Sequence, residues 1–298
     1  MIRTYFAVTI VLIKLVVCLS SSNNNLTATK TIEIRPGITY EYLYVKAINN
    51  KPTLLFLHGF PSSYHSWRHQ TNYFSQQGYG CLVPNLMGYG KTYSPSNDNE
   101  YNSKAMIDHL MILLDRVGLS NSSVFVIGHD WGARTASRFV LYHPERTISA
   151  ILLSVAYSPP VKFNLSLALQ QSLQVNVRAY LSAGMQQKLN WFKAVIANVD
   201  WNYEKTLNAT VQRPVLYIGG SKDYIGIIGA AERQKNYIKN LEIVEVDTGH
   251  WVMEEKPNDV NREIDRWIKK IMTHNSATTS FLLKSYIYSL ILYLILII

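Results

Sequence analysis

Short apolar runs bounded by turn residues alternate with segments of helical periodicity along most of the chain. Eight runs are predicted strands: Thr31–Ile34, Glu41–Ala47, Thr53–Leu57, Cys81–Pro84, Val124–Ile127, Ala150–Ser154, Pro214–Ile218 and Leu241–Val246. The predicted helices are Trp67–Gln77, Ser103–Val117, Trp131–His143, Ile227–Lys239 and Asn258–Met272. This alternation is typical of a mostly parallel sheet with crossover helices on both faces. The first two runs are expected to form an antiparallel pair.

The alternation breaks between residues 158 and 212. Pro159 and Pro160 end the sixth strand region, and a polar, helical stretch rich in aromatic residues follows. We therefore predict an α/β core from 31–157 and 213–272, with 158–212 as an insertion. Such sheets bind ligands beyond the carboxyl ends of their strands, so an insertion that leaves from a strand end is expected to act as a lid.

Both ends of the chain are apolar. Residues 1–20 contain Arg3, an apolar stretch and small residues at the end, which predicts a secretory signal peptide or, alternatively, an uncleaved signal anchor. Residues 275–298 resemble either a GPI-attachment signal or a membrane span. Either tail would tether the catalytic body to a membrane on the lumenal or extracellular side. Four glycosylation triplets suit this secretory route: Asn25, Asn121, Asn164 and Asn208.

Composition narrows the class of protein further. The chain has 298 residues, 48% of them hydrophobic, which suits one large domain with a sizeable core. Its net charge is +9, but Lys and Arg are scattered without a run of five, so no nucleic-acid partner is expected. Cys81 is the one cysteine beyond the predicted signal peptide and is expected to be a core residue. No metal-ligand spacing occurs, and neither a metal nor a cofactor is expected.

The segment Val126–Arg134 carries the central chemical motif. A predicted strand passes into a predicted helix through Gly128-His129-Asp130-Trp131-Gly132. Small residues around a sharp strand-to-helix turn are typical of a nucleophile elbow, and here its central residue is Asp130. Taken alone, Asp130 is equally explained as a helix cap.

Three further motifs follow predicted strands and complete the site. In His58-Gly59-Phe60, the backbone N–H of Phe60 is expected to pair with that of Trp131 as an oxyanion hole, while His58 suits a structural place in the same loop beside the pocket. Asp223 is expected to accept the Nδ1–H of His250, the predicted general base. The chain order of nucleophile, acid and histidine is that of the α/β-hydrolases.

From about Thr31 to Met272 the sequence resembles the epoxide hydrolases of soluble and fungal type. The carrying segments are HGFPSSYHSWRHQ (58–70), GYG (88–90), GHDWGAR (128–134), HPER (143–146), LNWF (189–192), GGSKDY (219–224) and GHWVMEEKP (249–257). The resemblance implies an α/β-hydrolase fold, with an eight-stranded sheet and a short helical lid after the sixth strand. It also implies hydrolysis of small apolar epoxides, such as oxidised lipids, through an ester on Asp130.

The resemblance departs from its pattern in the lid. Family members place a tyrosine at the end of an LNWY segment to protonate the epoxide oxygen, and this chain has Phe192 there. Tyr180 is a candidate substitute proton donor. A carboxylate nucleophile also suits haloalkane dehalogenases, which usually have Asn where this chain has Phe60. The third hypothesis is a catalytically impaired protein that binds an apolar ligand or a partner.

Overall fold

The computed structural model describes residues 28–162, 187–224 and 228–274. The predicted signal peptide, the apolar tail after residue 274, the sequons at Asn25 and Asn164, and Tyr180 all lie outside these ranges. Across the three ranges, no helix combines the length and the hydropathy that crossing a bilayer requires.

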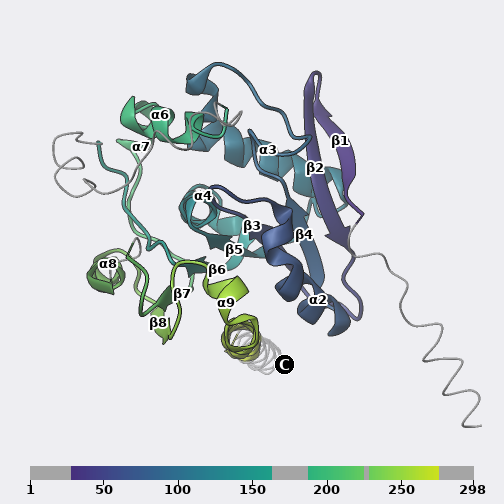
Figure 1. Ribbon diagram of the computed structural model, residues 1–298, viewed down its shortest axis with the longest axis vertical. Helices are drawn as coiled ribbons and strands as arrows, with labels where there is room; N and C mark the ends of the chain where they lie inside the picture. Colours follow the sequence, from purple (N-terminus) through teal and green to yellow (C-terminus); the bar gives the residue numbers. More distant parts are fainter. Residues whose placement is uncertain (1–27, 163–186, 225–227, 275–298) are drawn as a thin grey trace, which may run out of the picture.

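Eight strands of the described chain form one sheet (Figure 1). Their order is β1 (Lys30–Arg35), β2 (Ile38–Val45), β4 (Gly80–Pro84), β3 (Thr53–Leu57), β5 (Val124–His129), β6 (Thr147–Leu153), β7 (Val215–Gly220) and β8 (Leu241–Val246). β2 pairs antiparallel with β1 and β4, and the pairs from β4 to β8 are parallel. The predicted eight-stranded, mostly parallel sheet is confirmed. β2 begins earlier than predicted because the chain turns tightly at Gly37, whose φ is +77°.

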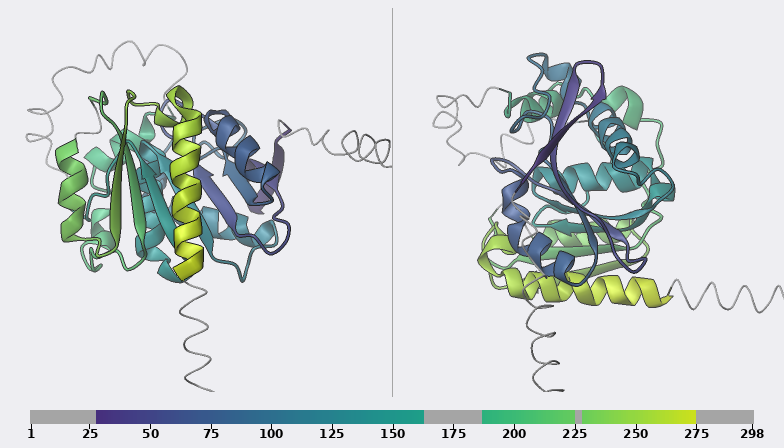
Figure 2. Two further views of the ribbon diagram at one scale, coloured as in Figure 1. Left: turned by 90° about the horizontal axis from the view of Figure 1, so that it is seen from below. Right: turned by 90° about the vertical axis from the view of Figure 1, so that its right-hand side faces the viewer.

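Helices cover both faces of this sheet (Figures 1 and 2). One core lies under α2 (Arg68–Gln76), α9 (Val252–Glu255) and the helix at 257–274; the other lies under α3 (Ser103–Arg116), α4 (Trp131–Tyr142) and α8 (Ile228–Arg233). Short 3-10 turns complete the layers: η1 (Tyr64–Trp67), η2 (Asp98–Tyr101), η3 (Pro144–Arg146) and η5 (Gln234–Asn236). Successive residues of the parallel strands alternate between the two cores, which explains the uninterrupted apolar runs.

The insertion leaves β6 and returns at β7, two strands that pair directly, as the sequence predicts. Its described part forms α6 (Asn190–Ile196) and α7 (Trp201–Glu204). Glu204 binds the guanidinium of Arg138 in α4, and its Oε1 accepts a hydrogen bond from the Tyr142 hydroxyl at 2.6 Å. Only 1% of Arg138 and 3% of Glu204 is exposed. This buried ion pair fastens the insertion to the helix that begins at Asp130.

We expect Glu204→Gln to lower the free energy of unfolding by about 3 kcal/mol, because it leaves the Arg138 charge buried without its counter-charge. Urea denaturation measures the loss. The double variant Arg138→Met/Glu204→Leu should regain most of it, since neither position of the pair then carries a buried charge. The same neutralisation at the exposed Lys222–Asp247 pair should leave stability nearly unchanged, because solvent screens both charges. An equal loss in the single and double variants would contradict the electrostatic explanation.

Candidate active site at the β5 turn

Asp130 stands at a sharp turn between β5 and α4, as the sequence predicts. Its φ of 53° and ψ of −121° are unfavourable for a residue with a side chain. The turn closes because two glycines permit close backbone approach. A Cβ on Gly128 would lie 2.1 Å from the Gly132 carbonyl oxygen, and a Cβ on Gly132 would lie 2.0 Å from that of Leu57. The strained turn lifts the Asp130 carboxylate beyond the end of the strand.

Two backbone N–H groups hold this carboxylate. The N–H of Phe60, in the loop after β3, donates to Asp130 Oδ1 at 2.8 Å, and the N–H of Trp131 also donates to it. Burial alone would raise the pKa of Asp130, but the hydrogen bond to His250, the nearby His129 and these N–H groups outweigh burial and lower it. Asp130 is therefore ionised at neutral pH although only 8% of it is exposed.

The loops after β7 and β8 bring Asp223 and His250 to this carboxylate. His250 Nε2 lies 3.4 Å from Asp130 Oδ2, and His250 Nδ1 lies 2.9 Å from Asp223 Oδ2. Burial alone would lower the pKa of His250; its hydrogen bonds to Asp130 and Asp223, and their charges, raise it to about 9. The structure thus brings together the three side chains that the sequence singles out, with the imidazole between two carboxylates.

This environment predicts how stability depends on pH. The folded-state pKa of His250, about 9, exceeds its ordinary value of 6.5. Its contribution is therefore fully present below pH 6.5 and is lost as the pH rises through 9. We expect the unfolding free energy of the wild type to fall across this interval more steeply than that of His250→Gln, as measured by urea denaturation. Parallel curves for the two proteins would contradict the raised pKa.

His58 occupies a supporting position beneath the site. Its side chain is fully buried, its Nδ1 lies 2.9 Å from the Gly59 carbonyl oxygen, and its Nε2 lies 3.0 Å from the Leu86 N. These bonds require a neutral ring with the proton on Nδ1, and burial lowers the pKa of His58 to about 4. With both nitrogens engaged, His58 holds the Phe60 loop against the loop after β4.

Aromatic rings from the core and the insertion lie close to Phe60 and Trp131, whose N–H groups hold Asp130. The Phe192 ring lies 5.1 Å from that of Phe60 and 4.6 Å from that of Trp131, centroid to centroid. Trp191 is buried 5.9 Å from Trp131, and its indole N–H donates to the Met87 carbonyl at 3.0 Å. The segment 189–192, singled out from the sequence, therefore lies over the site. Its rings form an apolar wall without a hydroxyl at position 192.

The contacts that hold the His250 loop escaped sequence reasoning. The His250 carbonyl accepts hydrogen bonds from His129 Nε2 at 2.8 Å and from Ser154 Oγ at 2.7 Å. The Glu255 carboxylate accepts the N–H groups of Gly249 at 2.8 Å and Trp251 at 3.1 Å. The sequence offers a signal only for His129, next to the nucleophile, because Ser154 resembles any serine that ends a strand.

Other surface features lie apart from this site. Asn121 and Asn208 are exposed outside helices and strands, as sequons require.

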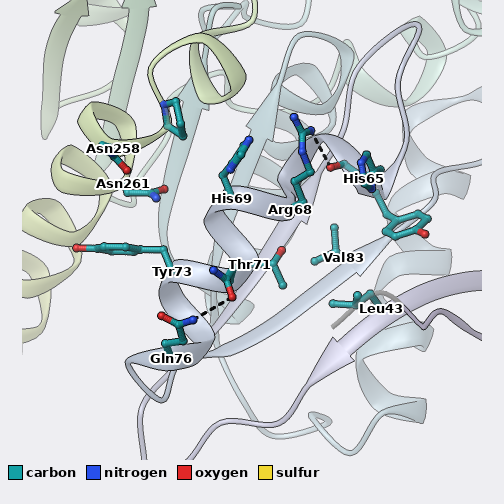
Figure 3. A pocket seen from close by; sticks show the side chains of 13 residues that line it. Leu43, His65, Arg68, His69, Thr71, Tyr73, Gln76, Val83, Asn258 and Asn261 are labelled. Carbon is teal, nitrogen blue, oxygen red and sulfur yellow. Dashed lines mark hydrogen bonds between the residues drawn. The ribbon is translucent and has the colours of Figure 1, made fainter. Parts of the chain in front are cut away.

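A hollow of about 490 Å³ runs beside α2 and the start of the helix at 257–274, and polar side chains such as Arg68, His69 and Asn258 line it (Figure 3). None of the three catalytic candidates lines it. Over the described ranges, no group of three or more His, Cys, Asp or Glu residues is arranged to hold a metal ion.

Comparison with known proteins agrees with this arrangement. A family model described as the α/β hydrolase fold matches residues 52–178. Epoxide hydrolase 2 of Siraitia grosvenorii is 40% identical over 124 residues, which is 41% of this chain and 39% of that protein. Bifunctional epoxide hydrolase 2 of Rattus norvegicus is 24% identical over 319 residues, which is 83% of this chain and 56% of that protein. The chain thus spans well under two thirds of these curated relatives.

Solved structures extend the likeness over most of the described chain. An epoxide hydrolase from Vigna radiata superposes with a TM-score of 0.72 at 23% identity, covering 84% of this chain and 99% of its own. Epoxide hydrolase I of potato, Solanum tuberosum, gives 0.68 at 23% identity, over 82% of this chain and 99% of its own. At this identity the likeness establishes the fold.

The sheet order, the turn at Asp130 and the matching family model make this chain an α/β-hydrolase-fold protein. The relatives and solved structures that it resembles are named epoxide hydrolases.

Proposed function

We propose that the protein hydrolyses small apolar epoxides through a covalent ester on Asp130. One observation carries the proposal. The turn carries a carboxylate, Asp130, where a serine hydrolase has a hydroxyl, and this carboxylate lies between two N–H donors and against the His250–Asp223 pair. A carboxylate is a weak nucleophile toward esters and amides, but it displaces a leaving group from saturated carbon. The epoxide hydrolase names of the relatives suggest the strained C–O bond as that group.

In the first half of the proposed reaction, an Asp130 oxygen bonds to one epoxide carbon and the C–O bond breaks. The alkoxide released takes up a proton from water, leaving a hydroxyalkyl ester on the enzyme. Esterification removes the Asp130 charge, one of the causes of the raised pKa of His250. The pKa of His250 therefore falls, its proton leaves, and the imidazole becomes a base.

In the second half, neutral His250 takes a proton from water while the water oxygen attacks the ester carbonyl of Asp130. The N–H groups of Phe60 and Trp131 stabilise the negative charge on the carbonyl oxygen. Asp223 holds His250 by Nδ1 and stabilises its positive charge. Collapse of the intermediate then breaks the bond between the ester carbonyl carbon and the diol oxygen. That oxygen takes the proton from His250, which frees the diol and regenerates the Asp130 carboxylate.

The experiment is to incubate wild type and Asp130→Asn with styrene oxide and examine both by intact-protein mass spectrometry and diol analysis. The proposal expects an ester adduct and diol from the wild type and neither from the variant. Neither product from the wild type would refute it. Halide release from a bromoalkane without diol formation would favour a dehalogenase, and ligand binding without turnover would favour a binding protein.

We further propose that the protein enters the secretory pathway and is glycosylated and membrane-tethered by its apolar tail. The exposed positions of Asn121 and Asn208 support glycosylation. To test glycosylation, the protein is expressed in a secreting eukaryotic host and run on a gel with and without peptide N-glycosidase treatment. Treatment should increase the electrophoretic mobility of the protein. Unchanged mobility would refute glycosylation.

Removal of residues 275–298 should release the protein from the membrane fraction, and continued membrane association would refute the tail as its tether.

A further inference from the structure

Ser154 contacts His250 from the end of β6, a strand that precedes none of the three catalytic candidates. It follows the last residue of β6 directly, and its side chain is fully buried. Its hydroxyl donates to the backbone carbonyl of His250 at 2.7 Å, across 96 positions of sequence. The base is thereby tied to the centre of the sheet as well as to its own loop.

The backbone at Ser154 is held in an unfavourable conformation. Its φ is +66°, in the left-handed region that glycine adopts readily and other residues adopt at a cost. Two hydrogen bonds to β7 fix it there: the Ser154 N–H donates to the Ile218 carbonyl at 2.9 Å, and the Tyr217 hydroxyl donates to the Ser154 carbonyl at 3.2 Å. A glycine would fit this angle without strain, whereas serine adds a hydroxyl directed at His250.

The second donor to the same carbonyl is His129. It is fully buried, its Nε2 lies 2.8 Å from the His250 oxygen, and none of the described residues gives its Nδ1 a hydrogen-bond partner. Nε2 must carry a proton to donate. Burial lowers the pKa of the ring to about 4, so the ring is neutral at pH 7. Ser154 and His129 together fix the His250 carbonyl from two neighbouring strands, β6 and β5.

Fixing this carbonyl fixes the imidazole. His250 is held at Nδ1 by Asp223, so the remaining freedom of the side chain is a shift of the loop as a whole. Glu255 restrains the flanking N–H groups of this loop, and Ser154 and His129 restrain the carbonyl between them. An error of about 1 Å in the position of a catalytic base lowers rates by as much as about 10²-fold.

We propose that Ser154 is a positioning residue for His250, and that its hydroxyl sets the imidazole for attack of water on the Asp130 ester. The inference rests on the proposed ester mechanism. It places the effect of Ser154 in the second half-reaction, because opening of the epoxide uses the Asp130 carboxylate, which Phe60 and Trp131 hold independently of Ser154.

Single-turnover measurements on wild type, Ser154→Ala and Ser154→Gly, with styrene oxide and quenched-flow mass spectrometry, separate the two half-reactions. We expect ester formation within about 2-fold of wild type and ester hydrolysis slowed about 10-fold in both variants, so that ester accumulates. Ser154→Gly loses the hydroxyl and also the backbone strain, so its thermal midpoint should not fall. Ser137→Ala is the matched control, since its hydroxyl is equally buried but donates to Ala133 within α4.

Unchanged ester hydrolysis in both variants would overturn the inference, and so would an equal slowing of both half-reactions with a lowered thermal midpoint, which marks a purely structural role. A wild type that forms no ester refutes the proposed function instead. The two failures are therefore distinguishable.

Discussion

Replacing His250 by glutamine is expected to stop the reaction halfway, with the ester on Asp130 formed but not hydrolysed. Glutamine has no basic nitrogen, so water at the ester loses its proton acceptor, while the Phe60 and Trp131 N–H groups still hold the carboxylate. We expect turnover to fall by about 10³-fold or more. Intact-protein mass spectrometry should show one stoichiometric adduct that persists after removal of styrene oxide.

The matched control for His250→Gln is Asp223→Asn, which keeps the size of the acid but removes its charge. Asp223 orients His250 and stabilises its positive charge through the 2.9 Å contact at Nδ1. This variant should also accumulate ester, with a smaller loss of turnover, because a base remains. Normal turnover by His250→Gln would exclude His250 as the base, and absence of any adduct would show that the imidazole is already needed for alkylation.

The candidate site residues were predictable because each lies at or just beyond the end of a strand of a parallel sheet. The carboxyl ends of such strands meet at one edge, so Phe60, Asp130, Asp223 and His250 are brought together by topology once the strands are recognised. The strands themselves were visible as apolar runs, because both faces of the sheet are buried. Local pattern and tertiary fold agree over this part of the chain.

The supports of the site were not predictable in the same way. Ser154 and His250 are joined by a hydrogen bond between a side chain and a distant carbonyl, which leaves no periodicity in the sequence. The ion pair between Arg138 and Glu204, which attaches the insertion to α4, is equally hidden. In the sequence both residues look like ordinary surface charges on helices. Which polar residues become buried is decided by packing between elements, after the elements themselves have formed.

The largest gain of activity is expected from Phe192→Tyr. An alkoxide is a poor leaving group, and this chain has Phe192 at the position where the family resemblance implies a tyrosine that protonates it. The half-buried Phe192 ring already lies against Phe60 and Trp131, the two residues whose N–H groups hold Asp130. A positioned acid accelerates such steps by about 10²-fold or more. We therefore expect Phe192→Tyr to form the ester from styrene oxide at least about 10-fold faster than wild type, with about 10²-fold as the full effect of a well-placed acid.

Phe192→Leu is the control, because it alters the same apolar wall without adding a hydroxyl, and it should not accelerate ester formation. Ester hydrolysis should change little in Phe192→Tyr, since in that step His250 takes the proton from water and returns it to the departing diol oxygen. If Phe192→Tyr forms ester no faster than wild type, then position 192 does not face the epoxide oxygen. Acceleration confined to ester formation would instead show that the supply of a proton from this wall limits the rate of ester formation in the wild type.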